Sequence, residues 1–305
     1  MSKKIEKARV TVKVLREIDI AVGVDWLTAT VSSAYPREKA AYDYEKVLDI
    51  IYPNDKPVSR PMKLLGYLGE GRGDVFFGER SDGWLMRVTG PKATLATVAL
   101  INRVWRPTRI DLQITVTLPE RSQRDLCDEI FQAAREHPVL SEDDGDDDDQ
   151  EEAKPRRKSA IYEDERGGKT VYLGSRSSDR FIRIYDKGVQ SGQDEAFKMY
   201  RFECEFKNRR AWKTWDALAR QRQRGWYETI ASIVVGELKR KGIYVDLPDG
   251  DGLFSVDLSL SVKDGTIERT LSWLSKSVSG SVQRLIDDGY EIAVYNALGL
   301  PLPPE

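Results

Sequence analysis

The stretch TVYLGSRSSDRFIRIYDK, residues 170–187, decides the fold class. Apolar and polar residues alternate in both of its halves, and a Gly- and Ser-containing segment separates them, which is typical of two β-strands joined by a turn. On the second strand, Arg183, Tyr185 and Lys187 share one face and two isoleucines share the other. The stretch therefore predicts a hairpin with an apolar face and a polar face on which a phenol lies between two cations.

The same alternation recurs along the chain, and helical periodicity separates the alternating segments. Strands are expected at 10–18, 23–31, 73–79, 83–90, 108–118, 169–175, 180–187 and 200–207. Helices are expected at 37–51, 91–105, 122–137, 209–241 and 266–289. The mixture predicts an α+β fold, with a mainly antiparallel central sheet, helices packed on one face and a helical C-terminal part.

Two segments of the chain align without a gap. Residues 73–90 match residues 169–186 at several positions, including the glycine, arginine and serine of the turn. Hairpins share such turn residues by chance, so the match alone does not prove duplication. It indicates that the sheet is built from two related halves, at about 20–105 and 106–207.

Charge is unevenly distributed along the chain. The formal net charge is −2, but nine carboxylates lie in residues 142–152, and without them the net charge is +7. Like-charge repulsion keeps such a run solvated, so a disordered acidic insert is expected at 141–153. The expected organisation is one domain over residues 1–265, which contains this insert, followed by a helical segment at 266–305 that packs on it.

Composition excludes several classes of protein. No apolar run approaches the length of a membrane span, and the N-terminus lacks the apolar core of a signal peptide. Cys127 and Cys204 lie in apolar periodic contexts and are expected to be reduced core residues, which favours a cytoplasmic protein. With His137 as its single histidine, the chain cannot form a zinc site or a metal site built on paired histidines.

Three expected strands each carry one polar face. If they are neighbours in the sheet, Asp111, Glu203, Glu205 and Tyr185 converge on one surface. A polar sheet face is often only a solvated one, and these carboxylates could simply pair with nearby arginines. Taken together, however, carboxylates, a phenol and cations on one face favour a metal-assisted phosphoryl-transfer site.

The chemistry of these side chains supports that interpretation. Mg²⁺ and Mn²⁺ take oxygen ligands such as the carboxylates of Asp111, Glu203 and Glu205. A tyrosine has an ordinary pKa of about 10 and needs help to act as a nucleophile. Arg183 and Lys187 would favour the phenolate of Tyr185 and would also hold a phosphate.

The chain resembles the replication initiation factor family of rolling-circle plasmids and phages, together with related relaxases of conjugative elements. The matching segments are VDWLTAT (24–30), GWLMRVTGP (83–91), TRIDLQIT (108–115), VYLGSRSSDRFIRIYDKG (171–188), YRFECEFK (200–207) and TLSWLSKSV (270–278). They cover most of the chain in the family's order. The combination of GSR, RIYDK and RFECEFK is the most specific part.

The resemblance implies a function and a set of site residues. It implies metal-dependent, sequence-specific nicking of DNA by the domain at 1–265 and strand transfer through a 5′-phosphotyrosyl intermediate. Tyr185 is then the nucleophile, and Asp111 and Glu203, with Glu205 as a third, are the ligands of Mg²⁺ or Mn²⁺. Arg183 and Lys187 steady the phosphate. Tyr172 also falls near the polar face and stays open as an alternative nucleophile.

The resemblance also implies partners. These are origin DNA in double- and single-stranded form, a host helicase and a host polymerase, with a homodimer as an open alternative and no membrane. The basic segment 207–226 offers cations for phosphates, whereas Trp212 and Trp215 are expected in the core. Three other functions remain open: a relaxase for mobilisation of an element, a catalytically silent DNA-binding regulator, and a metal-dependent nuclease that uses water.

Overall fold

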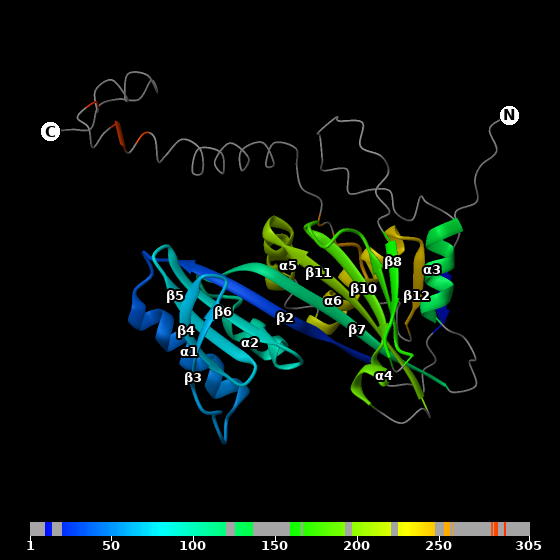
Figure 1. Cartoon of the computed structure of the whole chain (residues 1–305), viewed down its shortest axis with the longest axis horizontal. Helices are drawn as coiled ribbons and strands as arrows, with labels where there is room; N and C mark the ends of the chain where they lie inside the picture. Colours follow the sequence, from blue (N-terminus) through cyan, green and yellow to red (C-terminus); the bar gives the residue numbers. More distant parts are fainter. Residues whose placement is uncertain are drawn as a thin grey trace. The chain divides into compact units, whose positions relative to one another are not determined.

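The computed structural model describes most of the chain up to Leu258 (Figure 1). The described residues are 10–13, 20–119, 126–136, 159–165, 167–192, 197–220, 225–247, 253–256, 258, 282, 284–285 and 290. The chain divides into two compact units, Met1–Leu258 and Ser259–Glu305. The expected acidic insert at 141–153 lies outside the described residues, and so does the expected helical segment at 266–305 apart from four residues.

A ten-stranded sheet forms the centre of the first unit. Its strands are β2 (Ile20–Ser32), β3 (Arg60–Leu64), β4 (Tyr67–Arg72), β5 (Val75–Arg80), β6 (Gly83–Thr89), β7 (Arg106–Pro119), β8 (Ser159–Glu163), β9 (Lys169–Leu173), β10 (Arg180–Asp186) and β11 (Phe197–Lys207). They are ordered β3-β4-β5-β6-β2-β7-β11-β10-β9-β8, and every neighbouring pair is antiparallel. The predicted α+β class with an antiparallel sheet is confirmed.

Six helices and a small second sheet complete the described part of the chain. The helices are α1 (Arg37–Ile51), α2 (Lys92–Leu100), α3 (Leu126–Glu136), α4 (Lys187–Ser191), α5 (Asn208–Arg220) and α6 (Trp226–Arg240). The second sheet pairs β1 (Val10–Lys13) in parallel with β12 (Ile243–Asp246). No helix in the described ranges is long and apolar enough to span a membrane.

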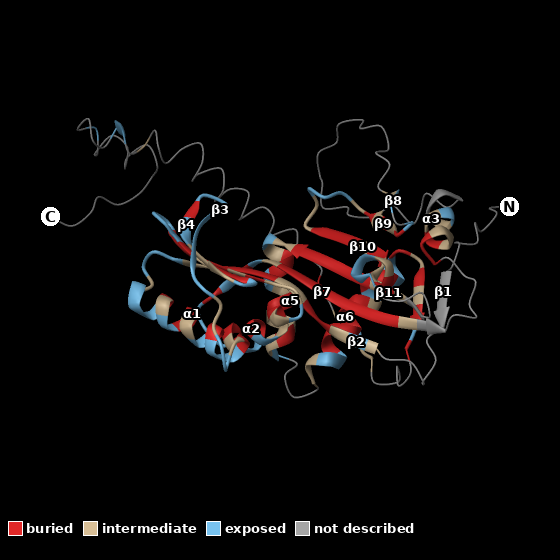
Figure 2. Cartoon of the chain, turned by 60° about the horizontal axis from the view of Figure 1, so that its bottom comes forward, coloured by how far each residue is buried: buried red, intermediate tan, exposed pale blue. Residues whose placement is uncertain are grey.

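One face of the large sheet forms the core. The alternating apolar residues of β7, β9, β10 and β11 are buried in one cluster together with residues of α1, α2, α3, α5 and α6. Figure 2 shows β7, β10 and β11 buried over most of their length. Because side chains alternate across a strand, burial of this face leaves the polar residues of the same strands on the opposite face.

The sheet has the same strand order on both sides of its centre. In each half a long first strand (β2 or β7) lies at the centre, and three strands then lead back from the edge to the last one (β6 or β11), which pairs with the first. In this arrangement β5 and β6 correspond to β10 and β11. The gapless alignment of 73–90 with 169–186 instead matches them with β9 and β10, because common turn residues dominated that short window.

The opposite face differs between the two halves. On β4, β5 and β6 it carries a small apolar cluster of Tyr67, Phe76 and Leu85. On β7, β10 and β11 it carries charged residues and Tyr185. The second half therefore has a polar face that is available for chemistry.

Candidate active site

The structure brings the predicted site residues together. Strand β11 lies between β7 and β10, so the three strands with polar faces are neighbours in the sheet. Glu205 is directly opposite Asp111 on β7, and Glu203 is directly opposite Arg183 on β10. Tyr185 lies two residues farther along β10, on the same face. The predicted convergence is thus confirmed, while the chemical role of each residue remains a prediction.

Asp111, Glu203 and Glu205 form a buried carboxylate cluster. Their exposed fractions are 0%, 4% and 5%. Arg109 donates two hydrogen bonds to Asp111, from Nε to Oδ1 at 2.9 Å and from Nη2 to Oδ2 at 2.6 Å. The same Nη2 lies 2.8 Å from Oε2 of Glu205. This arginine therefore compensates part of the cluster's buried negative charge.

A second arginine lies at the centre of the carboxylate cluster. Nη2 of Arg183 lies 2.9 Å from Oδ2 of Asp111, 3.6 Å from Oε2 of Glu205, and within hydrogen-bonding distance of Oε1 of Glu203. Lys207 adds a third cation, with Nζ 2.6 Å from Oε1 of Glu205. Three carboxylates thus face three cations, and one guanidinium nitrogen marks the point at which the carboxylates converge.

Burial makes the cluster costly to charge. Desolvation raises the pKa of Asp111 above its ordinary value, although Arg109 opposes this effect. Desolvation also raises the pKa of Glu203 to about 7, in spite of the Arg183 charge beside it. The arginines therefore offset only part of the desolvation, and Glu203 titrates near neutral pH.

Tyr185 has a different environment from the one expected. It is 9% exposed, and burial followed by the Glu203 charge raises its pKa above the ordinary value. Arg201 and Arg183 oppose this shift without cancelling it. Arg183 thus favours the phenolate as expected, but burial outweighs it and the net pKa shift is upward. Sequence alternation does not show how deeply the phenol is buried.

Lys187 does not continue the strand face of β10. Asp186 ends the strand and caps α4, where its Oδ1 accepts a hydrogen bond from the backbone N–H of Val189 at 3.0 Å. Lys187 is the first residue of α4, and its Nζ donates to Oε1 of Gln190 at 2.8 Å. Burial and the Arg201 charge lower the pKa of Lys187. Because the charges of Asp25 and Glu203 also act on it, Lys187 lies near the site although it follows the end of the strand.

Arg201 and Asp25 are site residues that sequence reasoning did not assign. Arg201 is directly opposite Tyr185 in the β10–β11 pair. Its Nη1 lies 2.7 Å from Oδ1 of Asp25, and its Nε donates to Oγ1 of Thr115 at 2.9 Å. The β2–β7 register shifts between Val24 and Trp26, so Asp25 is the extra residue of a bulge. Nothing in the local sequence indicates a bulge there.

Tyr172 lies on the polar face but belongs to an aromatic contact. It is opposite Arg183 on β9, and its ring stacks on that of Phe181 with centroids 5.4 Å apart. Arg176 lies over the same ring, with Cζ 4.9 Å from the centroid. These contacts use the ring of Tyr172, whereas Tyr185 is the tyrosine whose electrostatic surroundings include the carboxylate cluster.

The tryptophans of the basic segment separate into two kinds. Trp215 is buried in the core, as expected, but Trp212 is 47% exposed and the core expectation for it was wrong. Arg106 lies over the Trp212 ring, with Cζ 4.9 Å from the ring centroid.

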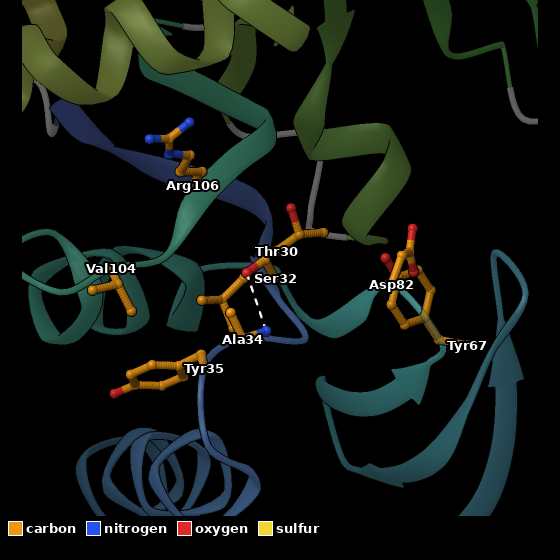
Figure 3. A pocket seen from close by; sticks show the side chains of 9 residues that line it. Thr30, Ser32, Ala34, Tyr35, Tyr67, Asp82, Val104 and Arg106 are labelled. Carbon is orange, nitrogen blue, oxygen red and sulfur yellow. Dashed lines mark hydrogen bonds between the residues drawn. The ribbon is translucent and has the colours of Figure 1, made fainter. Parts of the chain in front are cut away.

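Arg106 also lines an open pocket of about 680 Å³, in which Tyr35 and Val104 face Tyr67 and Asp82 across Thr30 (Figure 3).

The six predicted site residues lie outside that pocket. Its lining lacks a cluster of carboxylates, so its volume does not identify it as the reaction centre. The candidate active site is instead a set of largely buried side chains on one sheet face, at which the side chains of Arg109 and Arg183 are about a quarter exposed.

The donors of the carboxylate cluster are of the type that Mg²⁺ and Mn²⁺ prefer. Within the described ranges, no three His, Cys, Asp or Glu side chains are already arranged around a point as in a metal site. In the cluster, Nη2 of Arg183 takes the central position. The residues fit a divalent cation in charge and in donor type, provided that Arg183 leaves this position.

Comparison with known proteins identifies a family and a similar fold. Residues 108–291 match the family model described as replication initiation factor. The fold is similar to the structure of a rolling circle replication initiator protein from Geobacillus stearothermophilus, with a TM-score of 0.54 and 18% sequence identity over 79% of this chain and 100% of that one. No curated protein sequence matches the chain significantly. The family match covers more than half of the chain, including β7, β10 and β11, and the chain belongs to the replication initiation factor family.

Proposed function

We propose that this protein is a rolling-circle replication initiator that nicks DNA and keeps the cut strand on Tyr185. The observation that carries the proposal is the position of Tyr185. It lies on the same sheet face as the carboxylate cluster, on the strand next to Glu203 and two residues from Arg183. A nucleophile next to an anionic cluster able to hold a divalent cation is the arrangement that phosphoryl transfer requires.

In the proposed reaction, Oη of Tyr185 attacks the phosphorus of the scissile phosphodiester. The bond between phosphorus and the 3′ oxygen breaks as the bond from Oη forms. The phenol proton is released to solvent, and the departing 3′ oxygen takes up a proton and becomes a free 3′-hydroxyl. The products are a 5′-phosphotyrosyl link and a primer end for the polymerase.

Asp111, Glu203 and Glu205 would hold Mg²⁺ or Mn²⁺. Such an ion supplies charge that polarises the phosphate and stabilises its negative charge in the transition state. Arg183 marks where the carboxylates converge, because a single nitrogen contacts Asp111 and Glu203 and approaches Glu205. That the carboxylates already bind a cationic group supports the proposal of a cation site among them.

The cations around Tyr185 have separate roles in this account. Arg201, opposite Tyr185 and held by Asp25, supports the phenolate as it forms. Arg183, when it leaves the cluster, can reach a phosphate at Tyr185 on the same strand face and bind two of its oxygens. Lys187 adds long-range attraction from the start of α4.

The proposed partners follow from this chemistry. The substrate is origin DNA, which is bound as a duplex and nicked where it becomes single-stranded. A host helicase opens the duplex from the nick, and a host polymerase extends the 3′-hydroxyl. These steps take place in the cytoplasm, where the two buried thiols of Cys127 and Cys204 stay reduced.

The test uses the full chain and supercoiled DNA that carries the origin of its own element. With Mn²⁺ we expect relaxed DNA and a protein–DNA adduct that survives SDS, and with EDTA we expect neither. Nicking without an adduct would instead indicate a hydrolytic nuclease. Binding to the origin without nicking would indicate a catalytically silent regulator.

A further inference from the structure

Three aromatic side chains form a diagonal row across the polar face of the sheet. They are Phe181 on β10, Tyr172 on β9 and Tyr162 on β8, which are consecutive strands. The rings of Phe181 and Tyr172 stack, with centroids 5.4 Å apart and 23° between their planes. The ring of Tyr162 meets that of Tyr172 at 62°, with centroids 5.2 Å apart. These three residues are called the aromatic row below.

Exposure rises along the aromatic row. Phe181 is 4% exposed and lies opposite Glu205 of the carboxylate cluster. Tyr172 is half-buried, and Tyr162 is 61% exposed on β8, the last strand of the sheet. The stack on Tyr172 accounts for part of the burial of Phe181, but it does not account for a large exposed ring at the other end of the row.

A cation accompanies the row. The guanidinium of Arg176 lies over the Tyr172 ring, with Cζ 4.9 Å from the centroid. Arg176 belongs to the turn between β9 and β10, and its backbone oxygen accepts a hydrogen bond from Nζ of Lys207. Lys207 in turn pairs with Glu205. The turn that carries Arg176 is therefore fixed to the carboxylate cluster.

The row also lies beside Tyr185. In the β9–β10 pair, Tyr185 is opposite Thr170, and Tyr172 is two residues farther along β9 on the same face. Such diagonal neighbours are about 7–8 Å apart. A nucleotide next to a phosphate held at Tyr185 can therefore reach the Arg176–Tyr172 pair, and the following nucleotide can reach Tyr162.

We propose that the aromatic row and Arg176 form a binding site for the unpaired nucleotides that flank the cleaved bond. One base stacks on the exposed ring of Tyr162, another stacks on the Arg176 guanidinium over Tyr172, and Arg176 also attracts the backbone phosphate. Base–aromatic stacking tolerates any base, because every base has a π face, so the site would hold single-stranded DNA without reading its sequence. The proposal rests on the proposed function only in placing the cleaved strand on this face.

The test measures binding of a fluorescent oligothymidylate of about ten nucleotides, without divalent cation, to the full chain by anisotropy. Tyr162→Ala should weaken binding about tenfold, as expected for the loss of one base–aromatic contact worth about 1.4 kcal/mol. Tyr162→Phe keeps the ring and should bind like the wild type. The salt dependence should be unchanged in both variants, because neither removes a charge.

Two further variants separate charge from stacking. Arg176→Gln should weaken binding and also reduce the slope of log affinity against log salt by about one. Tyr42→Ala is the matched control, because Tyr42 is 56% exposed on α1 with Nζ of Lys46 5.5 Å from its ring centroid. This control should bind like the wild type, since α1 packs with the apolar face of the sheet.

The results that would overturn the proposal are distinct from those that would overturn the nicking activity. Wild-type affinity in Tyr162→Ala would remove the aromatic row from the DNA path. If the same variant also lost self-association in sedimentation, the exposed edge would be assigned to a second copy of the chain. Because the binding assay needs neither metal nor cleavage, a failure to form the Tyr185 adduct would leave its result unaffected.

Discussion

Nη2 of Arg183 lies 2.9 Å from Oδ2 of Asp111, at the point where the three carboxylates of the cluster converge. In the DNA-free protein this guanidinium satisfies charges that would otherwise be buried without a counterion. In the proposed reaction the same position belongs to a divalent cation. Arg183 and the metal therefore compete for one place.

Arg183→Gln should tighten the binding of Mn²⁺ by at least about tenfold, because the competing cation is removed. Calorimetry or electron paramagnetic resonance without DNA would measure this affinity. Arg201→Gln is the control, because it removes an equal charge nearby, from a residue that pairs with Asp25 and Thr115. An equal gain in Mn²⁺ affinity in both variants would show that only the loss of a nearby positive charge matters. It would refute competition between Arg183 and the metal for one position.

Asp111→Asn should destabilise the protein. The Asp111 side chain is fully buried and accepts hydrogen bonds from Arg109 and Arg183. The substitution therefore removes one negative counterion from both arginines. The side chains of Arg109 and Arg183 are 25% and 27% exposed, so water can partly solvate their charges. The expected loss in the free energy of unfolding is therefore about 1–3 kcal/mol, below that of a fully buried pair.

Chemical denaturation of the purified variant would measure this loss. Asp216→Asn is the control, because Asp216 pairs with Arg220 on the exposed surface of α5 at 2.8 Å. A surface pair of this kind contributes little, so the control should stay within about 0.5 kcal/mol of the wild type. Equal stability of the two variants would show that the carboxylate cluster does not depend on Asp111.

The rate of adduct formation should rise with pH. Burial and the Glu203 charge raise the pKa of Tyr185 above its ordinary value, so the phenol is protonated at neutral pH. Below that pKa the phenolate fraction grows tenfold per pH unit, and the single-turnover rate should follow it from about pH 7 to pH 9. A rate that instead levels off near pH 7 would show that ionisation of the phenol does not control the reaction.

Much of the candidate site could be predicted because it lies on regular strands. Alternation along β7, β10 and β11 is enough to place Asp111, Glu203 and Tyr185 on one face, since side-chain direction in a strand depends only on residue parity. The structure adds that the three strands are neighbours, which sequence alone left as a condition. The same reasoning predicted α1 at 37–51 with the observed bounds.

Other features depend on three-dimensional context. Asp186 was assigned to a strand together with Lys187, but its carboxylate caps α4, and this local hydrogen bond competes with strand pairing. The bulge at Asp25 and its pairing with Arg201 join residues on different strands, 176 positions apart in the sequence. The raised pKa of Tyr185 follows from burial, which a list of flanking charges does not reveal. Strands β3, β4, β8 and β12 were also missed.

The central claim is that Tyr185 is the nucleophile, and Tyr185→Phe beside Tyr172→Phe tests it most directly. Both variants keep an aromatic ring in place, so both should fold. With Mn²⁺ and supercoiled origin DNA, we expect the SDS-resistant adduct to be lost in Tyr185→Phe and kept in Tyr172→Phe. An adduct that persists in Tyr185→Phe and disappears in Tyr172→Phe would contradict the account and move the reaction centre to β9.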